Sequence, residues 1–108
     1  MPYANMPWVR RGEVTIPTGR VAIDSVQWFA WLDTVSAFCY SSQRSSMRLT
    51  ARREKRRQQF YWYGYCKVDA KLHNVYLGKC EQLTQDRLEQ ACQQLWRKVR
   101  KEEAPGQH

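Results

Sequence analysis

The fold of this chain is decided by residues 58–78, which run QQFYWYGYCKVDAKLHNVYLG. The tyrosines of its first half stand at every second position, and an alternation of period two is typical of a half-buried β-strand. Asp69-Ala70-Lys71 has turn chemistry, and a second apolar and aromatic run follows it. We expect strands at 58–68 and 72–78. So short a connection cannot hold a parallel crossover, and the two strands are therefore expected to pair antiparallel.

The same alternation extends backwards from this hairpin. We expect strands at 36–42 and 46–53, separated by the polar run Ser-Ser-Gln-Arg-Ser. A basic loop around Glu54–Arg57 would connect the second of them to the strand at 58–68. Residues 35–79 therefore predict an antiparallel meander.

Two helices are expected to flank the sheet. Residues 24–35, DSVQWFAWLDTV, place apolar side chains at helical spacing after a cap at Asp24 or Ser25. The second helix begins at Thr84, which resembles an N-cap, and runs to about Lys101. Its apolar positions recur on a single face. They are Leu88, Ala91, Cys92, Leu95 and Val99.

The predicted fold class is α+β, with a three- to four-stranded antiparallel sheet packed on a C-terminal helix and a short N-terminal helix. A chain of 108 residues has room for a single domain, which we place at 24–101. Residues 1–23 are expected to form an irregular N-terminal arm, in which 14–23 can form a short hairpin that Pro17 restricts to a sheet edge. Residues 102–108 are expected to be a flexible tail.

The charge of the chain is concentrated on the predicted sheet. The sequence has 18 Lys and Arg against 10 Asp and Glu, a net charge of +8. Residues 35–79 carry ten basic side chains against Glu54 and Asp69, so the whole excess belongs to this segment. A charge that served only solubility would be dispersed. Its concentration favours a polyanionic partner, and the excess of arginine favours phosphate and base contacts.

The alternation assigns the residues of the third strand to two faces. Tyr61, Tyr63, Tyr65 and Lys67 share one face, which we expect to be exposed. Phe60, Trp62, Gly64, Cys66 and Val68 share the other, which would meet the C-terminal helix. An exposed face of this kind can enter a DNA groove or stack on unpaired bases. Alternatively, the tyrosines pair across strands and the arginines are only solvated.

Other classes of function have little support in the sequence. Cys39, Cys66, Cys80 and Cys92 form no CxxC pair, and neither histidine stands at ligand spacing from them, so we expect no zinc site. The N-terminus has no apolar secretory core, which favours free thiols in a reducing cytosol. We expect neither a catalytic site nor a cofactor, because no paired carboxylates or phosphate-binding loop are recognisable. The basic run at 52–57 has no adjacent membrane-binding signal, so no membrane partner is expected.

Two resemblances refine this prediction. The stretch from Phe60 to Ala91 resembles the arm-type DNA-binding domain of tyrosine integrases and the Apetala-type plant domain, which lay a three-stranded sheet in the major groove. That resemblance implies that Arg48, Arg52, Tyr61, Tyr63 and Lys67 face DNA, with Lys71 and His73 near its backbone.

The closer resemblance is to a segment of some bacterial LuxR-type regulators and to short stand-alone bacterial proteins. It covers roughly residues 24–95. The matching motifs are WFAWL (28–32), LTARRE (49–54), YWYGY (61–65) and KLHNVYLGKCEQLT (71–84). Ala70 stands where these proteins usually have a turn glycine. The resemblance implies a role in regulation.

The sequence therefore predicts a cytoplasmic, nucleoid-associated protein that binds double-stranded DNA through a basic, aromatic sheet face, as a small prokaryotic regulator or mobile-element accessory factor. The alternatives are an RNA or single-strand binder that uses tyrosine stacking, and a module that docks an acidic protein. A protein partner or a homodimer stays open. The candidate nucleic-acid-binding residues are Arg44, Arg48, Arg52, Arg53, Lys55, Arg56, Arg57, Tyr61, Tyr63, Lys67, Lys71 and His73.

Overall fold

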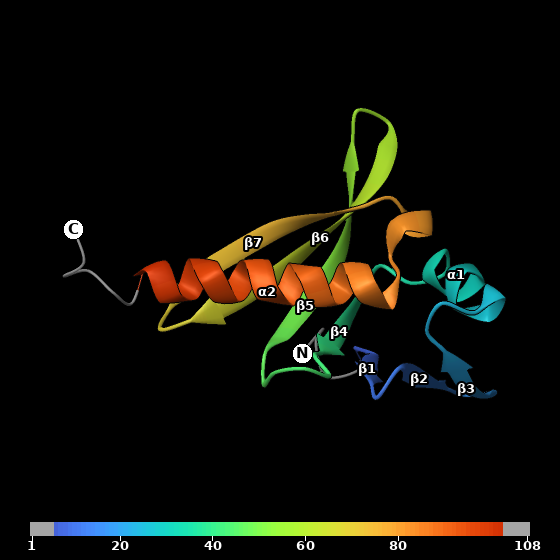
Figure 1. Ribbon diagram of the computed structural model, residues 1–108. Coiled ribbons are helices and arrows are strands. Elements are labelled where there is room, and N and C mark those ends of the chain that lie inside the picture. The colour runs from blue at the N-terminus through green and yellow to red at the C-terminus, as the bar shows by residue number, and fades with distance from the viewer. Residues whose placement is uncertain (1–5, 103–108) are drawn as a thin grey trace.

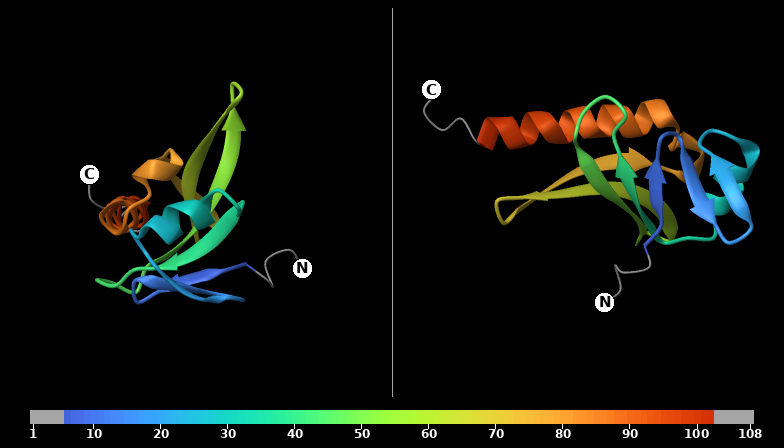
Figure 2. Two further views of the ribbon diagram at one scale, coloured as in Figure 1. Left: turned by 90° about the vertical axis from the view of Figure 1, so that its right-hand side faces the viewer. Right: turned by 90° about the horizontal axis from the view of Figure 1, so that it is seen from below.

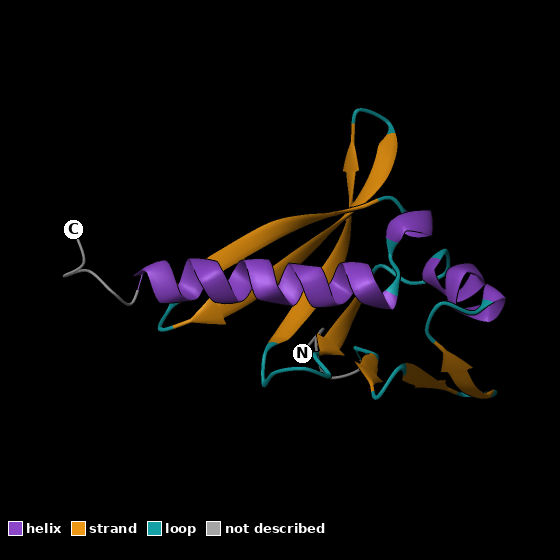
Figure 3. Ribbon diagram, viewed as in Figure 1, coloured by secondary structure: helices purple, strands orange, loops and turns teal. Residues whose placement is uncertain are grey.

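The computed structural model describes residues 6–102. It contains a seven-stranded sheet in the order β3-β2-β1-β4-β5-β6-β7. Both α-helices lie on one face of this sheet (Figures 1 and 3). The elements are β1 (Trp8–Arg10), β2 (Glu13–Ile16), β3 (Gly19–Ala22), α1 (Val26–Leu32), β4 (Ala37–Ser41), β5 (Arg48–Arg56), β6 (Gln59–Val68), β7 (Lys71–Gly78), the 3-10 turn η1 (Cys80–Gln82) and α2 (Gln85–Glu102).

The structure confirms the α+β class, the antiparallel meander and the C-terminal helix. The predicted number of strands was wrong, because the segment expected to be an irregular arm supplies β1, β2 and β3. The hairpin expected within 14–23 is present as β2–β3, at the edge of the sheet. The tail predicted at 102–108 lies outside the described residues, apart from Glu102, which ends α2.

The N-terminal strands join the sheet through one parallel pairing. β1 pairs with β4, placing Trp8 opposite Cys39 and Val9 opposite Tyr40, while the other pairs of the sheet are antiparallel. Each N-terminal strand contributes a single buried valine to the core. These are Val9, Val14 and Val21. These strands were not predicted because one apolar residue in a strand of three or four residues creates no recognisable alternation. In addition, a parallel partner strand about 30 residues away produces no pattern in the local sequence.

An aromatic cluster joins α1 to the centre of the sheet. The Trp28 and Phe38 rings meet edge to face with 5.6 Å between centroids, and Phe38 lies 5.3 Å from Trp62. All three side chains are fully buried. The Trp28 indole nitrogen donates a hydrogen bond to the Leu83 carbonyl at 2.8 Å. The short helix is thereby fixed to the segment that leads into α2, which supplies the tertiary packing that a seven-residue helix needs.

Both predicted N-caps are present. The Ser25 hydroxyl accepts a hydrogen bond from the Trp28 amide at 3.2 Å, and the Thr84 hydroxyl accepts one from the Arg87 amide at 3.2 Å. Asp24, the alternative cap for α1, instead accepts a hydrogen bond from the Gln85 amide at the start of α2. The Asp24 carboxylate therefore provides a hydrogen-bond acceptor for the first turn of α2 and not for that of α1.

The predicted apolar face of α2 is buried against the sheet. Basic side chains of the same helix reach the outer edge of β7. Arg87 donates hydrogen bonds to the carbonyls of Tyr76 and Leu77, and the Lys98 ammonium donates one to the Asn74 carbonyl. These contacts occupy carbonyls that an edge strand would otherwise offer to another chain.

Candidate nucleic-acid interface

The face of the sheet opposite the helices is exposed, and we call it the open face (Figure 2). Leu49 and Ala51 of β5 are buried on the helix side, so the alternate positions of this strand lie on the open face. The register extends the assignment to the other strands. The open face contains Trp8, Arg10, Glu13, Thr15, Arg20, Ala22, Ala37, Cys39, Ser41, Arg48, Thr50, Arg52, Glu54, Arg56, Gln59, Tyr61, Tyr63, Tyr65, Lys67, Leu72, Asn74 and Tyr76.

One part of the open face is a tryptophan flanked by two arginines. The guanidinium carbon of Arg10 lies 4.5 Å from the centroid of the Trp8 ring, and that of Arg48 lies 5.9 Å from it. A cation over an indole gains electrostatic attraction, and the outer groups of the guanidinium stay available for an anion. β1 and β5 therefore place two cations beside one aromatic platform.

The tyrosines pack on one another across β6 and β7. Tyr76 lies edge to face with Tyr63 at 5.5 Å and tilted against Tyr61 at 6.1 Å. Cations also lie over these rings, Arg56 at 5.2 Å from the Tyr63 centroid and Lys79 at 5.9 Å from that of Tyr61. Cross-strand pairing of the tyrosines, expected as an alternative use of these residues, is therefore present. The rings present edges and hydroxyls more than free stacking faces.

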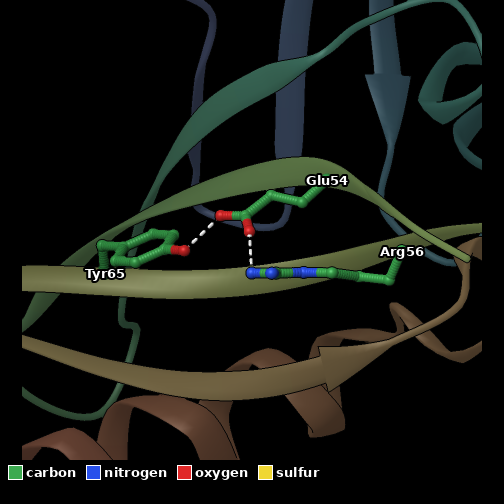
Figure 4. Close-up of polar contacts among 3 residues, drawn as sticks. All are labelled: Glu54, Arg56 and Tyr65. Atoms are coloured by element: carbon green, nitrogen blue, oxygen red, sulfur yellow. Dashed lines mark hydrogen bonds and ion pairs between the residues drawn. The ribbon is translucent and has the colours of Figure 1, made fainter.

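A carboxylate, Glu54, lies beside Tyr65 and Arg56 of the open face (Figure 4). Glu54 accepts a hydrogen bond from the Tyr65 hydroxyl through one oxygen and from the Arg56 guanidinium, at 2.5 Å, through the other. Burial, the hydrogen bond to Glu54 and its charge together raise the pKa of Tyr65 above 10.0. The Tyr65 phenol is therefore held as a neutral donor, and part of the Arg56 charge is balanced within the face.

Shallow hollows run along this face. One of about 590 Å³ lies between β5, β6 and β7, and Arg52, Glu54 and Lys67 contribute to its lining. A second, of about 330 Å³, extends from Thr50 and Tyr65 to Trp8. The two hollows adjoin, because both are lined by Thr50, Tyr65, Cys66 and Lys67.

The structure brings six of the twelve predicted site residues together on the open face. They are Arg48, Arg52, Arg56, Tyr61, Tyr63 and Lys67. Arg44 lies in the β4–β5 loop, and Arg57 lies in the β5–β6 turn. The alternation of β5 and β7 directs the remaining four to the helix-bearing face. These four are Arg53, Lys55, Lys71 and His73.

His73 and Lys71 therefore lie on the other side of the sheet from the tyrosines. His73 pairs with Cys66 and Lys71 with Val68, both of which alternate away from Tyr65 and Lys67. Arg53 likewise turns to the helix side, where its guanidinium donates to the Asp33 carbonyl at 3.3 Å. The resemblance to three-stranded-sheet DNA-binding domains implied that Lys71 and His73 approach the DNA backbone. The structure places Lys71 and His73 on the face opposite Tyr61, Tyr63 and Lys67, the residues for which the same resemblance implied contact with DNA.

Sequence reasoning missed several members of the open face. Trp8 and Arg10 were assigned to an irregular arm. Lys79, which follows β7 and lies over the Tyr61 ring of the open face, was counted only in the charge of its segment. Tyr76 was expected in a strand but was not connected with Tyr61 and Tyr63. A direct signal for Tyr76 existed, because a two-residue turn at Asp69-Ala70 fixes which residues of β7 lie opposite those of β6.

The thiols of Cys39, Cys66, Cys80 and Cys92 are free. Burial, the Glu89 charge and the Cys66 thiol raise the pKa of Cys92 to about 12, and burial also raises the pKa of Cys66 and Cys80. These three thiols are therefore less ionised than ordinary cysteines at neutral pH. Within residues 6–102, the structure contains no cluster of His, Cys, Asp and Glu that could hold a metal ion. No helix in this described part is both long and apolar enough to cross a membrane.

No family model, curated protein or solved structure matches this chain.

Proposed function

We propose that this protein binds double-stranded DNA through the open face of its sheet, as a small prokaryotic regulator or mobile-element accessory factor. One observation carries the proposal: the described helices both pack on one face of the sheet (Figure 2), and the register directs cations of β1, β5 and β6 to the opposite face. These cations are Arg10, Arg48, Arg52, Arg56 and Lys67. The role in regulation rests on the resemblance to segments of bacterial regulators.

The spacing of the β5 arginines supports a polyanionic partner. Arg48, Arg52 and Arg56 recur every four residues. Positions four residues apart in a strand are separated by roughly 13 Å. β5 therefore presents a row of three evenly spaced cations to the phosphates of a nucleic acid.

The tyrosine geometry favours duplex over single-stranded nucleic acid. A single-strand binder stacks bases on free aromatic faces. Here Arg56 and Lys79 lie over the Tyr63 and Tyr61 rings, and Tyr76 packs against both tyrosines. Backbone contacts from arginine and tyrosine hydroxyls need no such stacking face. We therefore expect phosphate contact to dominate.

The test is binding of the whole chain to duplex DNA, single-stranded DNA and RNA across a salt series. Six phosphate contacts give a log–log slope of about −5. We expect Arg48→Gln with Arg52→Gln to make the slope shallower by about 2 and to lower duplex affinity about tenfold or more, since two counterion-releasing contacts are lost. The matched control is Arg97→Gln with Lys101→Gln, which removes two exposed charges from α2.

Thermal melting of both double variants checks that each is folded. Preference for single strands would reject the duplex proposal in favour of base stacking. A flat salt slope would reject nucleic-acid binding and point to an acidic protein partner. Equal losses in the open-face and α2 variants would show that binding depends on net charge alone, and would reject the open face as the interface.

A second prediction concerns Glu54, the acidic residue of the open face that lies among the β5 arginines. Glu54→Gln removes a negative charge that repels phosphates and partly balances Arg56, while the amide oxygen can still accept the Tyr65 hydroxyl hydrogen bond. We expect duplex affinity at low salt to rise about twofold to fivefold, the scale of a screened charge interaction at a surface. Fluorescence anisotropy of a labelled duplex measures this affinity. A clear fall in affinity would contradict a repulsive role of Glu54.

A further inference from the structure

The end of the β5–β6 hairpin continues as a two-stranded ribbon beyond its neighbours in the sheet. The β4–β5 pairing ends at Arg52, and the β6–β7 pairing ends at Trp62. Residues 54–61, which we call the ribbon, pair only with one another, from Glu54 opposite Tyr61 to Arg56 opposite Gln59. Figure 1 shows this hairpin projecting past the ends of β4 and β7.

The formation of this ribbon corrects the sequence prediction of a basic loop around Glu54–Arg57. Glu54, Lys55 and Arg56 are strand residues, and the turn consists of Arg57 and Gln58. The segment lacks apolar alternation because it extends beyond the packed part of the sheet, where no face needs an apolar side. Lys55, Arg56, Arg57, Gln58 and Gln59 are accordingly all exposed.

Contacts at the base of the ribbon fix its direction. The Arg53 guanidinium contacts the Asp33 carbonyl after α1 and lies 5.0 Å from the centroid of the Phe60 ring. The Lys79 ammonium lies over Tyr61 on the other side. The base of the ribbon therefore contacts the segments on both sides of it.

The turn at the tip of the ribbon has a backbone conformation that favours glycine, but it contains two residues with long side chains. Arg57 and Gln58 both have positive φ, at 52° and 72°, as in the two-residue hairpin turns that prefer Asn-Gly. Non-glycine residues in this conformation cost roughly 1–2 kcal/mol each. Arginine and glutamine are also the side chains that hydrogen-bond guanine and adenine edges in two places.

We propose that the ribbon inserts into the major groove of duplex DNA, with Arg57 and Gln58 contacting base edges while the open face holds the backbone. This inference rests on the proposed function and adds the element that reads sequence. Paired strands lie about 4.8 Å apart. With side chains, such a ribbon fits the ~12 Å major groove and exceeds the ~6 Å minor groove. Phe60, 52% exposed on the ribbon, can contact a thymine methyl group.

The test uses Arg57→Asn with Gln58→Gly, which keeps the turn chemistry and removes both reading side chains. Because Asn-Gly prefers this turn, the variant is expected to melt no lower than the parent protein. One control places the same two residues at the other hairpin, Asp69→Asn with Ala70→Gly, where both residues also have positive φ. Because that control removes a negative charge, Arg97→Gln on α2 matches the positive charge lost with Arg57. The probe is a short duplex DNA library with a randomised central stretch, from which the parent protein selects its preferred sequences.

We expect the ribbon variant to lose about tenfold or more in affinity for the selected duplexes, the scale of one or two bidentate base contacts. Its binding to unselected duplex should keep a steep salt dependence. Methylation by dimethyl sulfate should show that guanine N7, in the major groove, is protected by the parent and control proteins and is exposed with the ribbon variant.

Unchanged affinity and unchanged protection in the ribbon variant would overturn the ribbon proposal without contradicting binding through the open face. Protection of adenine N3 would also overturn it, in favour of the minor groove. Failure of the parent protein to bind duplex would instead reject the proposed function.

Discussion

Val14→Asp is expected to abolish cooperative folding at neutral pH, although Val14 lies in a segment whose sequence resembles an arm. The Val14 side chain is fully buried on β2, and it belongs to the same core cluster as Val9 and Val21. An aspartate there would place a carboxylate among apolar side chains without a partner. Such a charge costs several kcal/mol, a large share of the ~5–15 kcal/mol by which domains are stable.

The matched control is Thr15→Asp, one residue along the same strand. Thr15 is exposed on the open-face side, and the change adds the same charge to the same strand. We expect its free energy of unfolding to stay within about 0.5 kcal/mol of the parent value. Circular dichroism during urea titration measures both variants. Near-native stability of Val14→Asp would show that β1–β3 can detach from the remaining sheet without unfolding it.

Glu89→Ala is expected to lower the free energy of unfolding by about 3 kcal/mol, because it leaves three hydrogen-bond donors without their acceptor. Glu89 lies on α2 and is 4% exposed. Its carboxylate accepts hydrogen bonds from the Tyr40 hydroxyl at 2.5 Å, the Ser42 hydroxyl at 2.7 Å and the Gln43 amide at 2.9 Å. This one side chain therefore connects the C-terminal helix to β4 and to the loop that follows it.

The variant Glu89→Gln removes the negative charge of this side chain but keeps an oxygen that accepts hydrogen bonds, so it tests the two contributions separately. The amide oxygen can accept two of the donors, so we expect a loss of only about 1–2 kcal/mol. A loss as large as that of Glu89→Ala would show that the negative charge, rather than the hydrogen bonds, provides the stability. Equal stability of parent and Glu89→Ala would contradict the structural role altogether.

The pH dependence of these variants follows from the pKa of Glu89. Burial alone would raise that pKa, but the hydrogen bonds from Tyr40, Gln43 and Ser42, together with the charge of Arg44, lower it below its ordinary 4.5. A lowered pKa stabilises the folded state above the pKa of the unfolded chain, and this stability is lost as the pH falls through the folded pKa. In urea titrations, the free energies of unfolding of the parent and of Glu89→Gln should therefore become more similar as the pH falls below about 4.5. A stability difference between the two proteins that increased in acid would contradict the lowered pKa of Glu89.

The elements of the C-terminal two thirds of the chain could be predicted because their signals are local. The α2 helix has a cap at Thr84 and one apolar face, and β6 has a strict alternation. The predicted division of the β6 residues into two faces is confirmed for Trp62 and Gly64, which are buried, whereas Phe60 is 52% exposed. Phe60 differs because it lies beyond the last β7 partner, on a part of the ribbon that the helices do not cover.

The space around Gly64 is occupied by its neighbours within the sheet. The alternation predicted that Gly64 lies on the face that meets the C-terminal helix. A Cβ at Gly64 would meet Val75 at 3.3 Å, Leu49 at 3.5 Å and Leu77 at 3.6 Å, side chains of the neighbouring strands. The glycine makes room within the sheet layer, so its replacement by alanine would crowd β5 and β7 rather than displace α2.

By itself, the sequence determined the meander, the two helices and the concentration of positive charge on one segment. Each of these depends on residues that are neighbours along the chain, through periodicity, caps and turns. Only the tertiary structure decided that residues 8–22 extend the sheet and place Trp8 beside Arg48. It also decided that His73 faces away from the tyrosines and that residues 54–61 project as a ribbon. The physical reason is that strand pairing joins residues distant in sequence, and its register alone decides which side chains share a face.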